Sequence, residues 1–579
     1  MRKGFALDAF QIEACKIVEA GRSVVVSAPT SAGKTVVAEY AIERALTSGG
    51  RTFYTTPIKA LSNQKFRDLS AEFGSQRVGL LTGDASIRPD AEIVVMTTEV
   101  LRNMLYTSSR ALRGLRCVVL DEVHYLMDPY RGPVWEEVMI HLEASVQMVS
   151  LSATVSNAAE LADWLQEIHG PTSVVVEHRR PVPLNHEMLL KERRSKQTRM
   201  IPVLHRGKPN RRLQEMFEAR RSLVAPRRVP VVRFLKNKRL LPAIYFLFSR
   251  KGCDEAARAC LEAGVHLTSS HEAERIREIL DQRRRLLSPQ DLQALGWDAW
   301  SEMAESGIAA HHAGLVPLIK EAVEEAFGEG LIKVVFATET LAMGVNLPAR
   351  TVVLEQLSRF RGDGHVPLTA ADYTQLTGRA GRRGVDDQGE AVVVWSPYLQ
   401  FDHLAELATT SEYPLESAFR PNYNMVVNLL ARSSREEAHE VLGRSFAQFR
   451  GRKRLHKARK RLRRAQAQLE EREQACTPEV WKAVEELLLV ESKSGAVLGR
   501  THGVLADLRP GDIITGTDAG APDVAVLSST RRSSGYRLKV VDASGNLRTL
   551  QASDFSVVPH LIGGVAIDYP LDPNDQDSQ

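Results

Sequence analysis

The chain contains 579 residues, which is too many for a single hydrophobic core and indicates about three to five domains. Its hydrophobic content of 43% and charged content of 25% are typical of a soluble globular protein. The net charge is only +5, so the overall charge does not by itself indicate a nucleic-acid partner.

The composition also argues against a secreted or membrane protein. The five cysteines form no CxxC pair, and their odd number fits no disulfide framework, so we expect reduced thiols and no zinc site. No run of about eighteen apolar residues follows the basic N-terminus or occurs elsewhere. We therefore expect a cytoplasmic protein with neither a signal peptide nor a membrane span.

Residues 1–180 alternate short apolar runs with amphipathic stretches, which predicts a first α/β domain. The apolar runs are rich in β-branched residues and have the length of buried strands. Such strands separated by helices are typical of a parallel sheet that helices cover on both faces. The predicted strands are residues 23–28, 51–56, 91–98, 116–122 and 147–154.

The same rhythm over residues 241–405 predicts a second α/β domain, so that two lobes would enclose a cleft. Between the two lies a linker or insertion, residues 181–240, in which Lys and Arg greatly outnumber Glu from residue 191 onward. Two interpretations remain open for this segment: a solvated linker, or a surface that faces nucleic acid and releases counterions from phosphates. The predicted strands of the second domain are residues 242–248, 332–338, 350–356 and 390–396.

The remaining residues predict three smaller regions and a tail. Residues 406–450 are helical, and residues 451–494 have the seven-residue apolar spacing of a coiled-coil stalk. The first half of this stalk is basic, which favours RNA contact and a solvated helix face about equally. Residues 495–568 alternate strands and turns, as in a small β-barrel, and the acidic tail, 569–579, is predicted to be disordered. The heptad positions are Leu455, Leu462, Leu469 and Cys476, with Ala458 and Ala465 between them.

The first chemical motif is APTSAGKT, which lies between a predicted strand and a predicted helix. A Gly-rich turn at this place presents backbone N–H groups to phosphates at the N-terminus of the helix. We expect Lys34 to bind the β and γ phosphates of ATP, and Thr35 to bind Mg²⁺. Ala28 stands where such loops usually have their first glycine. The expected phosphate-binding residues are Ala28, Pro29, Thr30, Ser31, Ala32, Gly33, Lys34 and Thr35.

The second motif is VVLDEVH, at residues 118–124. Asp121 ends an apolar strand, where its carboxylate can hold Mg²⁺ through water, and Glu122 is placed to activate the attacking water. Considered alone, His124 fits a structural role, as a helix-capping or core histidine, as well as it fits a functional one. Its place directly after this pair favours a role in coupling the ATP site to a nucleic-acid site.

The third motif, QLTGRAGRRG at residues 375–384, belongs to the second domain. Guanidinium groups stabilise the charge that builds up on a transferred phosphoryl group, so Arg379 and Arg382 are the candidates for this role. Gln375 can orient the water or a phosphate oxygen. A basic surface turn is the alternative interpretation. Because this motif is far from Lys34 along the chain, we expect the ATP site to be assembled between the lobes, so that the nucleotide opens and closes the cleft.

These motifs resemble those of superfamily 2 helicases, in the same order, across nearly all of the first 400 residues. The resemblance implies two tandem RecA-like domains. It also implies an adenine-sensing motif, in which Gln11 contacts the base and Phe5 is a possible stacking partner. The residues implied to couple hydrolysis to movement are Ser152, Thr154 and Gly344, together with His124. Contacts to the nucleic-acid backbone, which would explain translocation without sequence preference, are implied for Thr56, Lys59, Thr98, Ser249 and Thr338.

Residues 417–432 and 441–449 closely resemble the winged-helix entry of the superkiller-type helicases, which include exosome-associated RNA helicases and bacterial HelY-type proteins. The resemblance implies an α/β fold of two RecA-like domains, followed by a partial winged helix, a coiled-coil stalk and a KOW-like or SH3-like β-barrel. That group continues into a returning stalk, the rest of the winged helix and a helical bundle, whereas this sequence stops at Gln579. We expect a truncated product, a second chain that supplies the missing part, or a weaker grip on the strand.

The leading hypothesis is an ATP-dependent RNA helicase of the DExH type that uses ATP and Mg²⁺. By resemblance it would move 3′ to 5′ on single-stranded or tailed RNA, in RNA processing or decay. A DNA-repair helicase shares the ATP motifs, and an RNA-binding remodelling factor without processive unwinding is the other alternative. Besides RNA, the partners considered are a nuclease, a ribosomal particle or a chain that supplies the missing region.

Overall fold

The computed structural model describes most of the chain and divides it into two compact units, Met1–Lys453 and Arg454–Gln579. The described residues are 4–107, 109–219, 222–344, 347–361, 364–410, 412–421, 423–431, 434–475, 482, 500–515, 517, 522–532 and 535–565. The tail 569–579 and Cys476 therefore lie outside the described residues. Among the helices that the structure describes, none is both long and apolar enough to cross a membrane.

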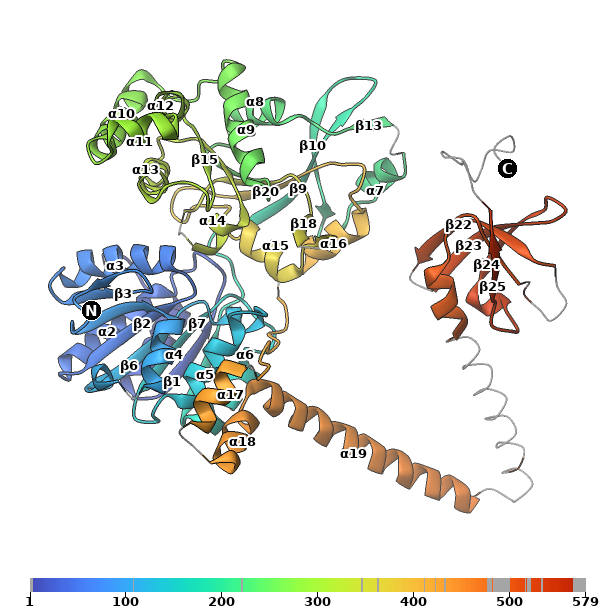
Figure 1. Cartoon of the computed structure of the whole chain (residues 1–579), viewed down its shortest axis with the longest axis horizontal. Coiled ribbons are helices and arrows are strands. Elements are labelled where there is room, and N and C mark those ends of the chain that lie inside the picture. The colour runs from blue at the N-terminus through green and yellow to red at the C-terminus, as the bar shows by residue number, and fades with distance from the viewer. Residues whose placement is uncertain are drawn as a thin grey trace. The chain divides into compact units, whose positions relative to one another are not determined.

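The first lobe is built on an eight-stranded sheet in the order β4-β3-β5-β2-β6-β7-β1-β8, in which only β4 runs antiparallel to its neighbour (Figure 1). Its strands are β1 Ser23–Ser27, β2 Arg51–Thr56, β3 Val78–Leu81, β4 Ser86–Ile87, β5 Ile93–Thr97, β6 Leu115–Leu120, β7 Gln147–Ser152 and β8 Thr172–Val176. Its helices are α1 Ala9–Glu19, α2 Thr35–Thr47, α3 Lys59–Phe73, α4 Thr98–Tyr106, α5 Gly132–His141 and α6 Ala158–Ile168, with the short 3-10 helices η1 Arg110–Leu112 and η2 Val123–Met127.

Two separate hydrophobic cores lie on opposite faces of this sheet. Successive strand residues alternate between them: Val118 packs with α4, α5 and α6, whereas Val119 packs with α1, α2 and α3. Side chains of a strand point alternately to the two faces, so a strand that is apolar at every position needs helices on both sides. The predicted doubly covered parallel sheet is thus confirmed.

The second lobe repeats this architecture with the order β10-β9-β20-β17-β14-β16-β15, and β13 pairs with β9. Its sheet strands are β9 Leu184–Glu192, β10 Thr198–Pro202, β13 Leu223–Val224, β14 Ala243–Phe246, β15 Ile308–His311, β16 Val334–Ala337, β17 Thr351–Leu354 and β20 Gly389–Val394. Two small hairpins, β11 Leu204–His205 with β12 Lys208–Pro209 and β18 Ser358–Arg361 with β19 Gly364–Pro367, lie beside it. Its helices are α7 Arg211–Glu218, α8 Arg228–Asn237, α9 Arg250–Glu262, α10 Ser270–Arg284, α11 Pro289–Leu295, α12 Trp297–Glu305, α13 Pro317–Gly328, α14 Glu339–Gly344, α15 Ala370–Thr377 and α16 Phe401–Thr409.

Residues 181–240 differ from the prediction of a linker or insertion between the lobes. Strand β9 pairs in parallel with β20, so this segment extends the second sheet. Leu213 of α7 and Val231 of α8 are buried in the same core as the strands of that sheet. The basic residues lie between these apolar ones in the sequence. They form the exposed faces of the helices, so the high positive charge of the segment does not exclude a buried apolar face.

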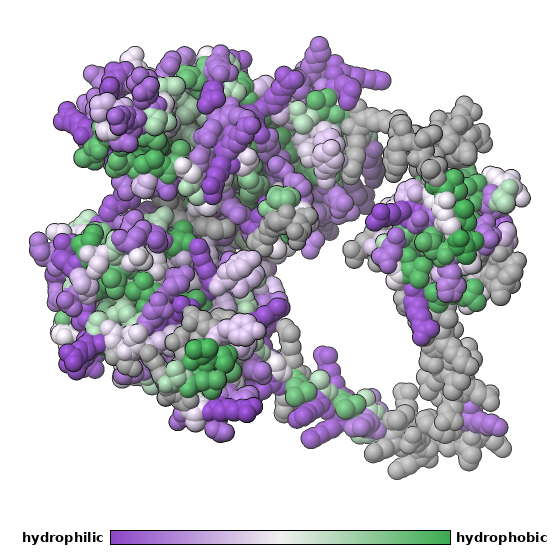
Figure 2. All heavy atoms as spheres, viewed as in Figure 1, coloured by the Kyte–Doolittle hydropathy of each residue, from purple (hydrophilic) through white to green (hydrophobic). Residues whose placement is uncertain are grey.

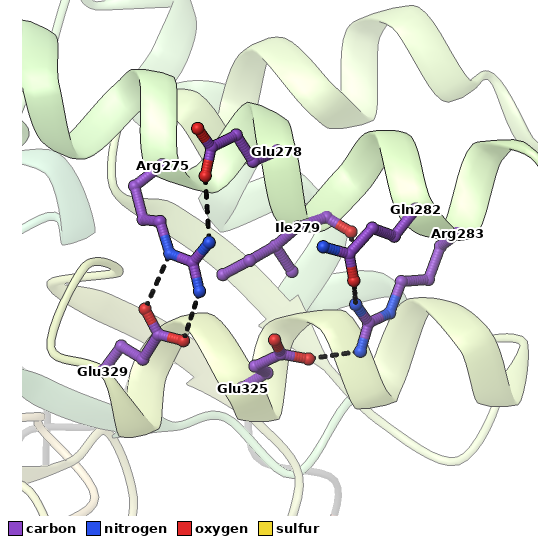
Figure 3. Close-up of polar contacts among 7 residues, drawn as sticks. All are labelled: Arg275, Glu278, Ile279, Gln282, Arg283, Glu325 and Glu329. Atoms are coloured by element: carbon purple, nitrogen blue, oxygen red, sulfur yellow. Dashed lines mark hydrogen bonds and ion pairs between the residues drawn. The ribbon is translucent and has the colours of Figure 1, made fainter.

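Ion pairs connect helix α10 with the end of helix α13 on the surface of the second lobe (Figure 3). Arg275 donates from Nε and Nη2 to the two carboxylate oxygens of Glu329, at 3.1 Å each, and from Nη1 to Glu278 at 2.9 Å. About two turns further along α10, Arg283 pairs with Glu325. Beneath these charges, Ile279 is buried in the core of the lobe. The charged groups therefore border a hydrophobic contact that carries the packing.

After α16 the chain returns to the first lobe. The backbone N–H of Phe446 donates to the buried Glu136 carboxylate at 2.8 Å, and Ser417 donates to the other oxygen of that carboxylate. Phe446 is itself buried in the first lobe's core beside Trp164. This returning segment contains α17 Tyr423–Leu430 and α18 Arg435–Gly443, and α19 Phe446–Ala475 follows. Figure 2 shows a hydrophobic patch over α17, where Val427 and Leu430 are exposed.

Helix α19 begins the predicted stalk, and Leu455 and Leu462 on it are exposed. Most residues from 476 to 499 lie outside the described part, so the coiled-coil pairing stays a prediction. The second unit contains a five-stranded antiparallel sheet in the order β24-β23-β22-β21-β25, packed around a small core. Its strands are β21 Asp512–Ile514, β22 Val524–Arg532, β23 Gly535–Asp542, β24 Leu547–Gln551 and β25 Leu561–Gly564, and η4 Ala552–Asp554 follows β24. This matches the small β-domain that the turn-rich sequence predicts.

Candidate active site

The loop between β1 and α2 has the shape that the phosphate motif predicts. Ser31 and Gly33 adopt positive φ angles of 63° and 85°, which turn successive N–H groups toward one side. The positive φ favours glycine at position 33, and a side chain there would also displace Gln11 Nε2, which it would approach to 2.8 Å. Lys34 Nζ donates to the carbonyl oxygens of Ala28 at 2.8 Å and Pro29 at 3.0 Å. The ammonium group thus lies inside the loop.

Asp121 and Glu122 follow the end of β6 and face the same loop. Glu122 adopts a left-handed φ of 55°, an uncommon backbone conformation for a residue other than glycine and one often found at functional sites. Burial raises the pKa of the Glu122 carboxyl, but the nearby His124, Lys34 and Arg379 outweigh burial and hold this pKa below its ordinary value. Burial and the neighbouring Glu122 charge raise the pKa of Asp121. The pair therefore combines one strongly ionised carboxylate with one that is harder to ionise.

Two residues that the motifs did not single out complete this acidic end. Tyr54 donates from its hydroxyl to Asp121 Oδ2 at 2.7 Å. Lys65 of α3 lies over the Tyr54 ring, 5.9 Å from its centroid, and donates to Thr35 Oγ1 at 3.2 Å. Lys65 is almost fully buried, which is rare for a lysine without a function or a partner. Lys65 lies on α3, six residues beyond Lys59, and only its burial, which the sequence does not show, distinguishes it from the other lysines.

The second lobe supplies arginines to the same place. Burial lowers the pKa of Arg379 and the Glu122 charge raises it again, so this half-buried guanidinium lies near the carboxylate. Arg382 donates from Nε and Nη2 to Asp386, at 2.8 Å each, which holds its guanidinium within the second lobe. Arg383, which was not predicted, donates to the carbonyl oxygen of Ala32 at 3.2 Å. Of the two predicted arginines, Arg379 is thus the one that faces the carboxylate pair.

A cavity of about 520 Å³ lies between these groups. Residues of both lobes line it, and Thr30 Oγ1 donates across the interface to the Gly378 carbonyl at 3.1 Å. A side chain on Gly378 would approach Thr30 Oγ1 to 2.2 Å, so the close approach of the lobes requires glycine there. The predicted residues among its lining are Thr30, Ser31, Gly33, Lys34, Thr35, Asp121, Glu122, Arg379 and Arg382.

The two residues predicted to sense adenine differ in their burial. Gln11 is buried; its Oε1 accepts from the Asp8 N–H at 2.9 Å, and its Nε2 donates to the Gly33 carbonyl at 2.9 Å. Its side chain therefore ties the start of α1 to the phosphate loop. Phe5 is 54% exposed and does not line the cavity among the described residues.

The residues expected to hold Mg²⁺ fit that ion in their chemistry. Thr35 offers a hydroxyl and Asp121 a carboxylate at one end of the cavity. Within the described ranges, no group of three or more His, Cys, Asp or Glu side chains is placed to hold a metal ion. This donor set agrees with the usual binding of Mg²⁺, which takes one or two protein oxygens and completes its shell with phosphates and water.

The predicted backbone-contacting residues follow the carboxyl ends of parallel strands in both sheets, which is where ligands bind in such folds. Lys59 and Ser249 are exposed; Lys59 pairs with Asp84 at 3.1 Å, and Ser249 caps α9. Thr56, Thr98 and Thr338 are buried, and their hydroxyls bond within the protein. Their side chains stabilise the loops from within. A nucleic-acid strand would therefore contact the backbone of these loops or neighbouring residues rather than these three hydroxyls.

Of the coupling candidates, His124 and the segment 152–154 form one hydrogen-bonded group behind the phosphate loop. His124 Nδ1 lies 3.3 Å from Glu122 Oε2, and it accepts from the Ala153 N–H at 3.4 Å. The Ser152 carbonyl accepts from the Ala28 N–H at 3.2 Å. Residues 152–154 are therefore bonded both to the acidic motif and to the phosphate loop. Gly344 ends α14, and Gln375 lies beside the Tyr125 hydroxyl.

Comparison with known families assigns three parts of the chain. Residues 8–161 match the DEAD/DEAH box helicase family, residues 265–384 match the helicase conserved C-terminal domain, and residues 500–579 match the HelY-like SH3 domain. The last match places an SH3-like family on the five-stranded sheet of the second unit.

Several curated proteins are similar to the chain. A probable helicase HelY of Mycobacterium tuberculosis (strain ATCC 25618 / H37Rv) is 50% identical over 466 residues, which cover 77% of this chain and 51% of that protein. A probable helicase HelY of Mycobacterium leprae (strain TN) is 44% identical over 607 residues, covering 97% and 65%. The exosome RNA helicase MTR4 of Homo sapiens is 40% identical over 461 residues, covering 77% and 44%.

The chain thus spans between 44% and 65% of the length of these three relatives. The order of the matched domains agrees with the order of the two lobes and the small β-domain. Two RecA-like lobes with a phosphate loop, a DEVH motif and arginines of the second lobe around one cavity are the shared core of such proteins. The chain belongs to the DExH-type superfamily 2 helicases, in the group of the HelY and superkiller-type proteins.

Proposed function

We propose that this chain hydrolyses ATP between its two lobes and uses the resulting lobe movement to translocate 3′ to 5′ on RNA and to unwind or remodel it. One observation carries the proposal: Arg379 of the second lobe faces Glu122 and lines the same cavity as Lys34 of the first. A catalytic site shared between two lobes is complete only when they are closed. Hydrolysis is then linked to the relative position of the lobes.

Each residue of the cavity has a chemical task in this proposal. The loop N–H groups and Lys34 bind the phosphates, and Glu122 accepts a proton from the attacking water. Arg379 stabilises the negative charge that grows on the transferred phosphoryl group. Bound Mg²⁺ supplies further charge neutralisation, and Thr35 and Asp121 are the residues that would hold it.

The connected coupling group gives hydrolysis a route to the nucleic-acid surface. Residues 152–154 are bonded to His124 on one side and to the phosphate loop on the other. Directly after them, Val155 forms a bridge to Tyr413 of the returning segment. A change at the phosphate end can therefore shift both the first lobe's loops and the segment that leads to α17.

RNA as the substrate is supported by the relatives and by the surface. Several relatives bear names that specify RNA, among them the DExH-box ATP-dependent RNA helicase DExH15, chloroplastic, of Arabidopsis thaliana. The exposed Lys59 and Ser249 stand at the strand ends where a nucleic-acid backbone would pass. Contacts to the backbone rather than to bases carry no sequence information, which suits movement along any RNA.

The test measures ATP hydrolysis by the full chain with single-stranded RNA, with single-stranded DNA and without polymer. Separation of a duplex with a 3′ single-stranded tail is measured in parallel, with a 5′-tailed duplex as the control for direction. We expect RNA to stimulate hydrolysis, and only the 3′-tailed duplex to be separated. Stimulation by DNA alone would overturn the proposal of an RNA substrate, and stimulation by RNA without strand separation would favour a remodelling factor.

Two variants check the assignment of the site in the same assay. Lys34→Ala removes the ammonium that binds phosphate, and Glu122→Gln removes the base while keeping the shape of the side chain. We expect both to lose nearly all hydrolysis, by about 10² to 10⁴-fold for the base, while RNA binding is mostly retained. Survival of hydrolysis in Glu122→Gln would show that another group activates the water.

A further inference from the structure

A second cavity, of about 200 Å³, lies between the lobes on the other side of the catalytic groups. It shares three lining residues with the first cavity: Thr30, Glu122 and Arg379. Its volume is several times the roughly 30 Å³ that a water molecule occupies in the liquid. At its other end, His178 is exposed. The cavity therefore extends from the catalytic groups to the edge of the interface.

The lining of this second cavity is rich in groups that suit an anion. Arg180 donates to the backbone carbonyls of Val182 at 3.3 Å and Ala380 at 2.7 Å, and no carboxylate of the described residues forms an ion pair with it. Burial lowers its pKa only to about 10, so Arg180 stays charged at neutral pH. A partly buried cation without a counter-charge is costly unless an anion visits it.

A second observation points into the same space. His124 is about nine-tenths buried and lines the second cavity, and its Nε2 has no hydrogen-bond partner among the described residues. Its other nitrogen, Nδ1, accepts from the Ala153 N–H and lies 3.3 Å from Glu122 Oε2. Thr374 and Thr410 belong to the same lining. The open nitrogen thus belongs to the ring whose Nδ1 lies 3.3 Å from the carboxylate that both cavities share.

The order of product release creates a need for such a space. In the proposed reaction the γ phosphate lies at the inner end of the first cavity, against Glu122 and Arg379, while the rest of the nucleotide fills the space on the other side. Once water has attacked, ADP blocks the way that the substrate came in. Inorganic phosphate must then wait for ADP or leave by another route.

We propose that the second cavity is the exit route of inorganic phosphate, with Arg180 as the binding group at its middle. The inference rests on the proposed hydrolysis of ATP. Phosphate passes Thr30 and His124, meets the Arg180 charge, and reaches solvent near Thr410 and His178. The walls of the cavity come from both lobes, and a phosphate bound at Arg180 would contact both. Its departure removes the negative charge that Arg180 attracts. The lobes can then separate while ADP is still bound.

The first test narrows the exit. Thr410→Trp places a large side chain in the cavity wall, and Thr409→Trp places the same side chain on the exposed neighbouring position, which does not line the cavity. Hydrolysis is run in water enriched in ¹⁸O. Phosphate that stays bound reverses to ATP and is hydrolysed again, and each round replaces one of its oxygens with an oxygen from water.

We expect Thr410→Trp to raise the number of water oxygens per released phosphate several-fold, and Thr409→Trp to match the natural chain. Equal oxygen incorporation in all three proteins would overturn the exit route. This readout does not depend on the overall rate, so a variant that is merely less active does not imitate the expected result.

The second test removes the charge and remains informative if the tryptophan variant folds poorly. Arg180→Gln is compared with Arg179→Gln, since Arg179 is the exposed neighbour and does not line the cavity. Total phosphate in acid-quenched samples is followed beside free phosphate reported by a fluorescent phosphate-binding protein. We expect Arg180→Gln to change the delay between the two signals by at least about threefold, with the hydrolysis step itself less affected.

An unchanged delay in Arg180→Gln would overturn the role of Arg180. Failure of the underlying proposal has a different appearance, because a chain that does not hydrolyse ATP produces no phosphate signal of either kind in the natural protein.

Discussion

Two clusters of charged residues, among those that the structure describes, differ in how far water reaches them. Between the lobes, Asp121 is buried, and Lys34, Glu122 and Arg379 are half-buried, around one cavity. On α10 and α13, Arg275 makes more ideal ion pairs with Glu329 and Glu278, but all three side chains are more than a third exposed. Coulomb attraction at similar distances is many times stronger where water is excluded. Good geometry therefore marks the surface cluster, and burial marks the functional one.

This contrast predicts that substitutions will have effects in the order of burial rather than in the order of hydrogen-bond quality. The following predictions run from the largest effect to the smallest.

Replacement of Arg379 has the largest expected effect. Arg379→Gln should reduce the rate of hydrolysis by about 10³ to 10⁵-fold, because a guanidinium at the transferred phosphoryl group contributes by this amount in related chemistry. The matched variant Arg382→Gln should have a much smaller effect, since Asp386 holds that guanidinium within its own lobe. The measurement is the single-turnover rate at saturating ATP. Equal losses in both variants would contradict the assignment of Arg379.

Replacement of Lys65 sharpens the comparison inside the buried cluster. Its ammonium lies beside Thr35, where it competes with Mg²⁺ for the same electrostatic position. Lys65→Met should therefore lower the Mg²⁺ concentration that gives half-maximal hydrolysis, by roughly 3- to 10-fold, which corresponds to about 1 kcal/mol. Lys59→Met on the same helix, measured without RNA, is the control, since Lys59 is exposed and pairs with Asp84. An unchanged Mg²⁺ requirement would show that Lys65 only packs.

Replacement of Glu136 tests the effect of burial on stability at a carboxylate that is outside the cavity. Burial raises its pKa to about 7, although Ser417 and the Phe446 N–H donate to it. The folded protein therefore holds more protons than the unfolded protein between about pH 4.5 and pH 7, and the stability conferred by this group falls as the pH rises through that window. Glu136→Gln should be more stable than the natural chain at pH 8, by up to about 3 kcal/mol, and the advantage should shrink toward pH 5.

The measurement is thermal unfolding of both proteins at several pH values, compared as a difference so that other titrating groups cancel. A difference that does not change with pH would contradict the raised pKa of Glu136.

The surface cluster should show the smallest effect. Arg275→Ala should leave the unfolding temperature and hydrolysis nearly unchanged, because exposed ion pairs are screened by water and salt. Ile279→Ala, one turn away on the same helix, should lower the unfolding temperature clearly, since Ile279 is fully buried. If the two variants had equal effects, burial would not be the deciding factor.

Much of the fold could be predicted because long apolar runs mark strands that are buried on both faces. Strands that lack such runs could not be found in this way. Gly79 interrupts β3, where a side chain would approach the Arg88 carbonyl to 2.1 Å, and β15 contains the two small residues of Ile-Ala-Ala-His. Strand β9 was hidden by the charges that follow it. In each case the neighbours in space, rather than the local pattern, decide the structure.

The site shows the same division. Lys34, Asp121, Glu122 and Arg379 belong to motifs whose spacing reflects their chemistry, and the structure brings them to one cavity. Lys65 is a lysine on a helix that contains other polar residues, and only its burial distinguishes it. Thr56 and Thr98 belong to motifs that resemble nucleic-acid-binding loops. The resemblance does not show that their own hydroxyls bond within the protein.

The contact of Arg383 with Asp8 has a consequence for the equilibrium between closed and open molecules. Arg383 pairs with Asp8 at 2.9 Å across the lobe interface, but both side chains are about 40% exposed. Such a contact contributes little free energy, so it stabilises the closed arrangement of the lobes only weakly. A ligand that prefers one arrangement by about 1.4 kcal/mol then shifts the ratio of closed to open molecules tenfold. In the proposed reaction, small differences in affinity between ATP and its products are therefore enough to change the ratio of closed to open molecules.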